Sequence, residues 1–561
     1  MNYDILPGLK FRSSYSLEYS GVNEERFYDP RNNAGAAVGG SVYFNDSKVI
    51  NWQTDQTLTY NRVFNEDHNL SALLGFNYRN EVFTKHGSQG NAVATPAFGN
   101  TLTGTTPVMV TSTYDQFKLA GIFGRIGYTF KNKYIAQFTL RRDGSSRFGA
   151  NNVFGYFPAV SAAWRLVDEA FMETVPVFSE LKLRASYGET GNSELMVNTS
   201  GAGSYYPALS LFSTSPEASY NGAAGVSFFQ LGNANLGWER NVTKNIGLDY
   251  GLFKGRISGT LDYFIRTTKD LLLNRPLPNT SGFTTIAENV GSLENRGLEI
   301  GMNTVNLTGA FKWSTDINFT FLDNKVLSLI NDGQDLPANN LWVGKALGTQ
   351  YLVKWAGVNP ADGRPMWYDA NDQITYVPVA ADRRFGIGSN LIPDYYGGIT
   401  NTFAFKGFEL SAFFQFQVGT VQQDQPTGWL LSDFRYPYNQ DASILNRWTA
   451  PGDVTGVPRI SPGATFPGTS SPIFGSTGAG SDRFFSDASY IRLKTVTFGY
   501  TFPASWLQRT GLSRARLYVQ GYNLWTGTNY TGLDPEFTAG GYNMGLAPQG
   551  KSYTLGIQLG F

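Results

Sequence analysis

The sequence predicts an all-β fold, a transmembrane antiparallel β-barrel, and three observations support this prediction. Segments of about ten residues alternate between apolar and polar or small side chains, the period of a strand whose two faces meet different surroundings. The connections between these segments alternate between short and long. No apolar run approaches the ~20 residues of a membrane-spanning helix, so a chain of this kind could cross a bilayer only as a barrel.

The composition agrees with strands that are apolar on one face only. Aromatic residues make up 15% of the 561 residues, yet the mean hydropathy is −0.24 and only 16% of residues are charged. The 44 basic residues balance the 44 acidic ones, which gives no indication of a nucleic-acid partner.

Sixteen alternating segments follow one another along the chain, each about as long as a tilted membrane strand. The expected strands are 9–19, 48–62, 70–81, 117–130, 134–143, 156–166, 181–188, 239–252, 256–266, 290–305, 310–321, 394–404, 408–418, 490–502, 514–524 and 551–561.

The connections provide the stronger signal, because outer-membrane barrels combine short periplasmic turns with long extracellular loops. The short connections are 63–69, 131–133, 167–180, 253–255, 306–309, 405–407 and 503–513. The long ones are 20–47, 82–116, 144–155, 189–238, 267–289, 322–393, 419–489 and 525–550. The two longest, 322–393 and 419–489, far exceed ordinary connections and are therefore expected to be functional.

Aromatic side chains lie near many strand ends, where they would form the interfacial girdles of a barrel. Other aromatic residues lie in the long loops, and these are the candidates for substrate contact, since exposed rings stack on sugars or grip peptides. The alternative for each is packing within its loop. The loop candidates are Tyr205, Tyr206, Trp342, Trp355, Trp367, Tyr368, Trp429 and Tyr436.

Little in the sequence points to an enzyme, a metal or another cofactor. The chain has no cysteine and only two histidines, His68 and His86, so there is almost no raw material for a multi-histidine site or a Ser-His-Asp triad. The acidic segment "YDANDQ" lacks the glycine and closing glutamate of a calcium loop and is interpreted as a solvated turn. "RRDGSSRFG" (141–149) is interpreted as an ion-pair network at the barrel rim, with a substrate clamp as the alternative.

Several stretches, in order along nearly the whole chain, resemble TonB-dependent receptors of the SusC/RagA family. They are "YIAQFTLRRDGSSRFG", "SGFTTIAENVGSLENRGLEIGMN", "GVNPADGRPMWYDAND", "RWTAPGD", "DASYIRLKTVTFGYTFP" and "GYNLWTGTNYTGLDPEF". The closing segment resembles the family's barrel-assembly signal, a terminal aromatic residue preceded by alternating apolar ones: Tyr553, Leu555, Ile557, Leu559 and Phe561.

The resemblance implies a barrel of the 22-stranded, plugged class, of which about 16 strands are expected here. Residues 1–561 are accordingly interpreted as a partial outer-membrane barrel without the signal peptide, TonB box and plug domain. The resemblance also implies three partners. They are a SusD-like surface lipoprotein, outer-membrane lipid, and TonB-ExbB-ExbD acting through a plug domain outside this chain.

The function that the resemblance implies is TonB-dependent uptake of oligosaccharides or peptides across the outer membrane of a Bacteroidetes-type Gram-negative cell. Two alternatives stay open from the sequence. The first is a passive sixteen-stranded porin with an open aqueous lumen. The second is a barrel that serves as a surface platform for binding or adhesion.

Overall fold

The computed structural model describes residues 1–561 apart from eleven short stretches. The residues outside the description are 195–204, 215–222, 224, 334, 338–339, 390, 425–438, 461–479, 509–510, 537–541 and 544–546. The chain divides into two compact units. Unit 1 comprises residues 1–164, 184–244 and 267–292, and unit 2 comprises residues 165–183, 245–266 and 293–561.

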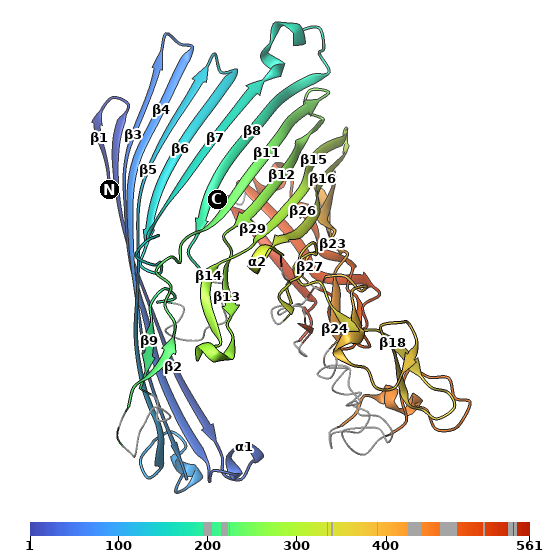
Figure 1. Ribbon diagram of the computed structural model, residues 1–561. Coiled ribbons are helices and arrows are strands. Elements are labelled where there is room, and N and C mark those ends of the chain that lie inside the picture. The colour runs from blue at the N-terminus through green and yellow to red at the C-terminus, as the bar shows by residue number, and fades with distance from the viewer. Residues whose placement is uncertain are drawn as a thin grey trace. The chain divides into compact units, whose positions relative to one another are not determined.

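Unit 1 begins with a meander of seven antiparallel strands, each paired with the next one along the chain (Figure 1). Its strands are β1 (Asn2–Leu6), β2 (Leu9–Tyr28), β3 (Ser41–Phe64), β4 (His68–Asn91), β5 (Thr106–Phe130), β6 (Tyr134–Ser145) and β7 (Phe154–Arg165). The tight hairpins between β3 and β4 and between β5 and β6 place Asn65, Glu66, Lys131 and Asn132 at positive φ, as turns that match the strand twist require.

Unit 2 contains a second antiparallel meander, in which the pairing runs β16–β22–β23–β26–β27–β29. These strands are β16 (Phe311–Ser328), β22 (Tyr395–Phe405), β23 (Phe408–Val418), β26 (Tyr490–Thr501), β27 (Arg514–Thr528) and β29 (Ser552–Gly560). The other long strands of the chain are β8 (Phe178–Asn192), β11 (Glu239–Leu252), β12 (Ile257–Lys269) and β15 (Ser292–Thr308).

Helices in the described residues are short and lie in connections. They are α1 (Asn33–Ala36), α2 (Ile330–Gly333) and α4 (Ala504–Leu507), with the 3-10 turns η1 (Pro96–Phe98), η2 (Leu166–Asp168), η3 (Ala170–Met172), η6 (Asn279–Ser281), η8 (Ala380–Asp382) and η9 (Ala442–Asn446). None of the helices in this described part is long and apolar enough to cross a membrane.

Each of the sixteen predicted segments falls on a strand, but several predicted boundaries are wrong. Strands β3, β4 and β5 contain 24, 24 and 25 residues, each at least nine residues longer than the segments 48–62, 70–81 and 117–130 predicted for them. The hairpins therefore continue into regions predicted as the loops 20–47 and 82–116. In those regions the two strands of each hairpin remain paired in a register that is unbroken over most of its length. The side chains there no longer alternate in polarity, so the sequence pattern did not indicate the pairing.

The two faces of the unit 1 meander differ in chemistry. On one face Phe138 lies beside Ile126 and Val160 in register, and half or more of each of these apolar side chains is exposed. On the opposite face, one residue away, Gln137 pairs with Gly127 and Ser161. An apolar surface of this extent is unusual for a protein surrounded by water and is the pattern of a lipid-facing strand.

The closing strand β29 has the same two-faced construction. Tyr553, Leu555 and Ile557 are 73%, 71% and 69% exposed, although β29 pairs along its length with β27. The use of these residues, with Leu559 and Phe561, as a barrel-assembly signal stays a prediction.

We expect Phe138→Arg to destabilise the protein by about 2–4 kcal/mol, because Phe138 lies midway along the apolar face of β6. Gln137→Arg is the matched control, since it adds the same charge one residue away on the polar face. Unfolding in detergent, followed by the heat-dependent shift in gel mobility, measures the difference. Equal effects of the two substitutions would contradict a lipid-facing assignment.

Candidate functional site

The polar face of β3–β6 carries two hydrogen-bonded groups of side chains, together called the inner polar face: Asn51 with Arg79 and Glu81, and Asn77 with Arg141 and Asp143. The Arg79 guanidinium donates to Asn51 Oδ1 at 3.1 Å and pairs with Glu81 Oε2 at 2.6 Å. The register places Asn51 beside Glu81 and so brings these side chains to one face. Because they are partly exposed and polar, they present a surface for a hydrated solute.

Arg141 and Asp143 form the rim network that the motif "RRDGSSRFG" predicts. Arg141 Nε lies 2.5 Å from Asp143 Oδ2, and its Nη2 donates to Asn77 Oδ1 at 2.8 Å. Gly121 makes room for this cluster, since a Cβ there would lie 2.1 Å from Asp143 Oδ1. The ion pair between Arg141 and Asp143 is thus confirmed, whereas a wider network at the barrel rim and the alternative of a substrate clamp stay predictions.

Tyr205 and Tyr206, two of the predicted contact residues, anchor their loop to the inner polar face. The Tyr205 hydroxyl donates to Glu81 Oε1 at 3.1 Å, and Arg147 stacks 5.8 Å from the Tyr205 ring centroid. The Tyr206 hydroxyl accepts the backbone N–H of Gln116 at 2.9 Å. Burial and the neighbouring Glu81 carboxylate raise the pKa of Tyr205 to about 12, so this residue stays a hydrogen-bond donor at neutral pH.

The loop between β16 and β22 folds into small sheets in unit 2. They comprise β17 (Leu352–Val353) with β21 (Arg383–Arg384), and β18 (Trp355–Val358), β19 (Pro365–Tyr368) and β20 (Ile374–Thr375). Here Trp355 packs edge-on against Trp367 at 5.4 Å, and Trp342 packs against Tyr351 and Phe385.

The acidic turns of this loop are structural, as predicted. Asp369 Oδ1 accepts the backbone N–H groups of Asn371 and Gln373 at 2.8 and 2.9 Å, which closes the turn "YDANDQ". Asp362 pairs with Arg364 at 2.7 Å. Within the described ranges, no group of three or more His, Cys, Asp or Glu side chains could hold a metal ion.

Segments of two long loops, 419–489 and 525–550, meet in a further small sheet. Strand β24 (Val421–Asp424) pairs antiparallel with β25 (Phe485–Asp487) and parallel with β28 (Tyr542–Asn543). Gln422 is fully buried in this sheet and donates to the carbonyl oxygen of Pro535 at 2.6 Å. The loops 322–393 and 419–489 are also joined, because Asp482 Oδ1 accepts the backbone N–H of Trp355 at 2.7 Å.

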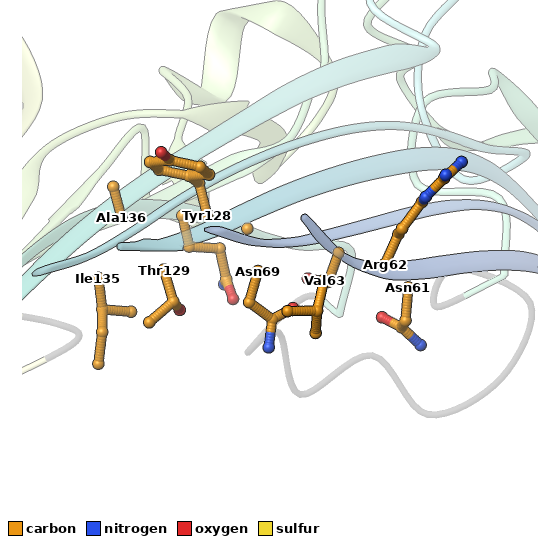
Figure 2. A pocket seen from close by; sticks show the side chains of 11 residues that line it. Asn61, Arg62, Val63, Asn69, Tyr128, Thr129, Ile135 and Ala136 are labelled. Carbon is orange, nitrogen blue, oxygen red and sulfur yellow. The ribbon is translucent and has the colours of Figure 1, made fainter. Parts of the chain in front are cut away.

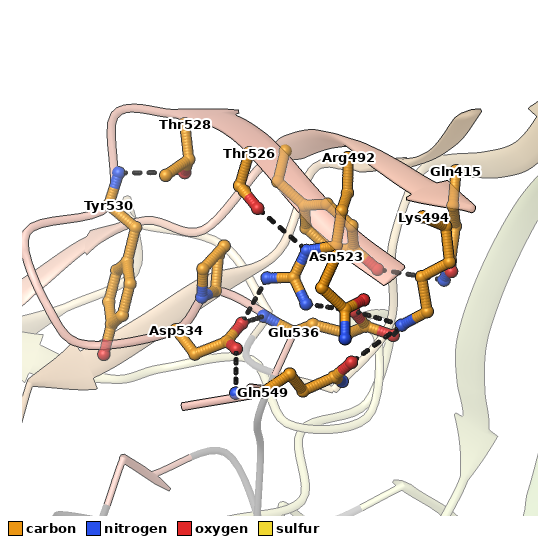
Figure 3. Close-up of polar contacts among 12 residues, drawn as sticks. Gln415, Arg492, Lys494, Asn523, Thr526, Thr528, Tyr530, Asp534, Glu536 and Gln549 are labelled. Atoms are coloured by element: carbon orange, nitrogen blue, oxygen red, sulfur yellow. Dashed lines mark hydrogen bonds and ion pairs between the residues drawn. The ribbon is translucent and has the colours of Figure 1, made fainter. Parts of the chain in front are cut away.

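A buried ion-pair cluster fixes the loop 525–550 to strand β26 (Figure 3). Arg492 is only 3% exposed, and its guanidinium contacts Asp534 at 2.6 Å, Glu536 at 2.7 Å and the Thr526 hydroxyl at 2.9 Å. Lys494 adds a second ion pair to Glu536 at 2.8 Å. We call this set the Arg492 cluster.

The protonation of Asp534 follows from its place in this cluster. Burial alone would raise the pKa of Asp534, but hydrogen bonds from Arg492 and from the backbone N–H groups of Gln549 and Glu536 outweigh it, so the pKa lies below its usual value. The carboxylate is therefore ionised at neutral pH.

A concave surface of about 380 Å³ lies near the short turns of β3–β6 in unit 1 (Figure 2). Its polar side chains include Asn61, Asn69, Ser71, Thr129 and Gln137. Sequence reasoning did not identify it, because amides and hydroxyls are common in turns and on polar strand faces and carry no distinctive motif.

The predicted contact residues fall into three groups. Tyr205 and Tyr206 lie against the inner polar face, whereas Trp342, Trp355, Trp367 and Tyr368 lie within the folded loop of unit 2. Trp342 and Trp367 are only 8% and 4% exposed, so packing within the loop covers their rings. Trp429 and Tyr436 lie outside the described residues. Contact with a substrate stays a prediction for all eight.

Comparison with known proteins places the chain in a family. The family model described as "TonB dependent receptor-like, beta-barrel" matches residues 2–381. The chain therefore belongs to the family of TonB-dependent receptor β-barrels. TonB-dependent receptor P3 of Formosa agariphila is 32% identical, over 100% of this chain and 57% of its own length. TonB-dependent receptor SusC of Bacteroides thetaiotaomicron is 28% identical, over 79% of this chain and 44% of its own length.

The fold matches solved structures of the same type. The structure of the RagAB peptide transporter superimposes with a TM-score of 0.83 and 25% identity, over 100% of this chain and 60% of that chain. The resemblance to SusC and RagA, inferred from the motifs, is thus confirmed. The chain spans somewhat more than half the length of the first relatives that it matches.

We expect Tyr205→Phe to loosen the loop that carries Tyr205, because the substitution keeps the ring and removes the hydrogen bond to Glu81, which contributes about 1 kcal/mol. Amide hydrogen exchange at residues 205–213 should rise several-fold. Tyr187→Phe, which removes a hydroxyl bonded to Glu189 on β8, is the control and should leave that loop unchanged. No change in exchange for Tyr205→Phe would contradict an anchoring role.

We expect Arg492→Met to release the loop 525–550, because it leaves the buried carboxylate of Asp534 without its ion-pair partner, at a cost of about 3–5 kcal/mol, while Glu536 keeps its ion pair with Lys494. Limited proteolysis of the loop measures the release. Arg516→Met is the control, since its ion pair with the more exposed Glu409 contributes only about 0–1 kcal/mol. Equal protease sensitivity of the two variants would count against a special role for Arg492.

The same loop should respond to acid. Since the folded pKa of Asp534 lies below the unfolded value of about 3.9, its contribution to stability is present above that pH and disappears as the pH falls through the folded pKa. The protection of residues 525–536 against hydrogen exchange, taken relative to the intrinsic exchange rate at each pH, should therefore be constant between pH 7 and about 5 and should fall only below about 4. Release of the loop near neutral pH would contradict an ionised Asp534.

Proposed function

We propose that the chain forms the barrel of an outer-membrane transporter that takes up oligosaccharides or peptides with energy supplied through TonB. The observation that carries the proposal is the two-faced construction of the long strands. Their apolar face suits lipid, and their inner polar face, with Arg79, Glu81 and Arg141, suits a hydrated solute in transit. Membership of the TonB-dependent receptor family supports the same conclusion.

The proposed partners follow from the relatives. A SusD-like surface lipoprotein would cover the extracellular loops, and TonB-ExbB-ExbD would act through a plug domain. The similarity to a structure described as a peptide transporter supports a peptide cargo, and the oligosaccharide alternative rests on the resemblance to the SusC/RagA family. The folded loops of unit 2, joined by β24 and the Arg492 cluster, offer a firm surface for such a lipoprotein.

Uptake in the native host tests the proposal. Deletion of the gene should abolish growth on one oligosaccharide or peptide mixture that is the sole carbon source. Deletion of TonB should also abolish this growth, while binding of the cargo to the cell surface persists. Restoring the gene should restore growth. A variant with Arg79 and Arg141 both changed to Ala should retain insertion but slow uptake of that cargo.

Two outcomes would favour the alternatives. Uptake that persists without TonB, together with a large steady conductance of the purified protein in planar bilayers, would indicate a passive porin. Unchanged uptake after gene deletion, with loss of cell-surface binding, would indicate a binding or adhesion platform.

A further inference from the structure

We infer that the outward face of unit 1 carries a binding site for the headgroup of a phosphorylated glycolipid in the outer leaflet, centred on Arg142, Phe154 and Tyr156. The inference rests on the membrane placement proposed above and goes beyond transport, because this site lies on the face opposite to the inner polar face.

The strand register determines on which face of the sheet the site lies and at what depth in the membrane. On β6 and β7, the outward pairs begin with Tyr134–Trp164 beside the short turn, and the last two, Arg142–Tyr156 and Gly144–Phe154, lie beside the long connection. The eight residue steps from Tyr134 to Arg142 span about 26 Å along the strand. After a tilt of about 40° they cover most of an apolar band about 25 Å tall. Arg142 and Tyr156 therefore lie where the hydrocarbon gives way to the headgroups of the outer leaflet.

The Arg142 guanidinium is held by aromatic rings instead of carboxylates. It lies 3.9 Å from the ring centroid of Phe154 and 5.6 Å from that of Tyr156, and both rings are more than half exposed. Over the stretches that the structure describes, no carboxylate forms an ion pair with Arg142, in contrast to its neighbour Arg141, which pairs with Asp143. A cation fixed on aromatic faces at a membrane interface remains available to an anionic group.

A pocket of about 430 Å³ adjoins the two rings, and both Phe154 and Tyr156 line it. Its other walls include Asn152, Asn235 and Asn289, which offer amide groups, Arg240, which pairs with Glu189, the carboxylate Asp270, and Phe157, the register partner of Arg141. The pocket is held in shape by hydrogen bonds, since Asn289 donates to the carbonyl oxygen of Gly237 at 2.9 Å and Asn152 donates to that of Asn235 at 2.6 Å.

These groups together match one class of ligand. A guanidinium binds a phosphate, an aromatic face stacks on a sugar ring, and amides bond to sugar hydroxyls. A phosphorylated glycolipid presents all three at the level of Arg142 while its acyl chains lie along the apolar face below. A zwitterionic phospholipid offers the phosphate but no sugar ring for the pocket, so we expect it to bind less tightly.

Native mass spectrometry of the protein extracted from its host membrane in a mild detergent tests the inference. The probe is a phosphorylated diglucosamine glycolipid, compared with phosphatidylethanolamine. We expect one glycolipid molecule to be retained by the wild-type protein and its apparent Kd to rise at least tenfold in Arg142→Gln. Phe154→Ala should weaken binding several-fold.

Arg62→Gln is the matched control, because Arg62 also stacks on an outward aromatic ring, 4.8 Å from the Phe64 centroid, at the opposite ends of the strands. It should leave glycolipid binding unchanged. Equal losses in Arg62→Gln and Arg142→Gln would overturn the inference, as would equal affinity for phosphatidylethanolamine.

Two further results separate the possible failures. Competition by inorganic phosphate alone at millimolar concentration would indicate a site for any phosphate and would overturn the inference. A protein that shows the heat-dependent mobility shift of a barrel but retains no glycolipid would refute this site and leave the proposed function intact. A protein that is soluble without detergent would instead refute the membrane placement, and with it both proposals.

Discussion

The pairing of every long strand with its neighbours is the constraint on which the structure depends. In hydrocarbon an unpaired backbone N–H or C=O costs several kcal/mol, so each strand of the two meanders must be bonded along its membrane-spanning length. Once the backbone is satisfied by neighbours, side chains are free to differ between faces. The row of Phe138, Ile126 and Val160 on one face and of Gln137 and Ser161 on the other is the direct result.

Since much of the apolar surface faces outward, the loops are held together by other means. In unit 2 the Arg492 cluster and the buried Gln422 tie loop segments to a strand and to one another. Ion pairs of this kind contribute little net stability compared with an apolar core, but they fix one arrangement of long segments that would otherwise adopt many. The buried rings of Trp342 and Trp367 also help to fix this arrangement by packing within the loop.

Adjacent residues on β6 show how one strand serves two environments. Arg141 faces inward, where Asp143 and Asn77 hold it among groups suited to a solute in transit. Arg142 faces outward, where Phe154 holds it at the level of lipid headgroups. The chemistry of the two side chains is the same, and only the two-residue period of the strand separates the surface proposed for transport from the site inferred for a lipid headgroup.

The sequence by itself determined the class of fold, because a two-residue period and the order of short and long connections can be read from the chain without knowing any distant contact. The family followed from the resemblance of its motifs. The sequence could not determine where β3, β4 and β5 end, since beyond the apolar band only pairing with a neighbour extends a strand. Nor could it indicate the Arg492–Asp534 pair, whose members lie 42 residues apart in the chain. The partners of a loop side chain depend on which segments the fold brings together, and only the tertiary structure decides that.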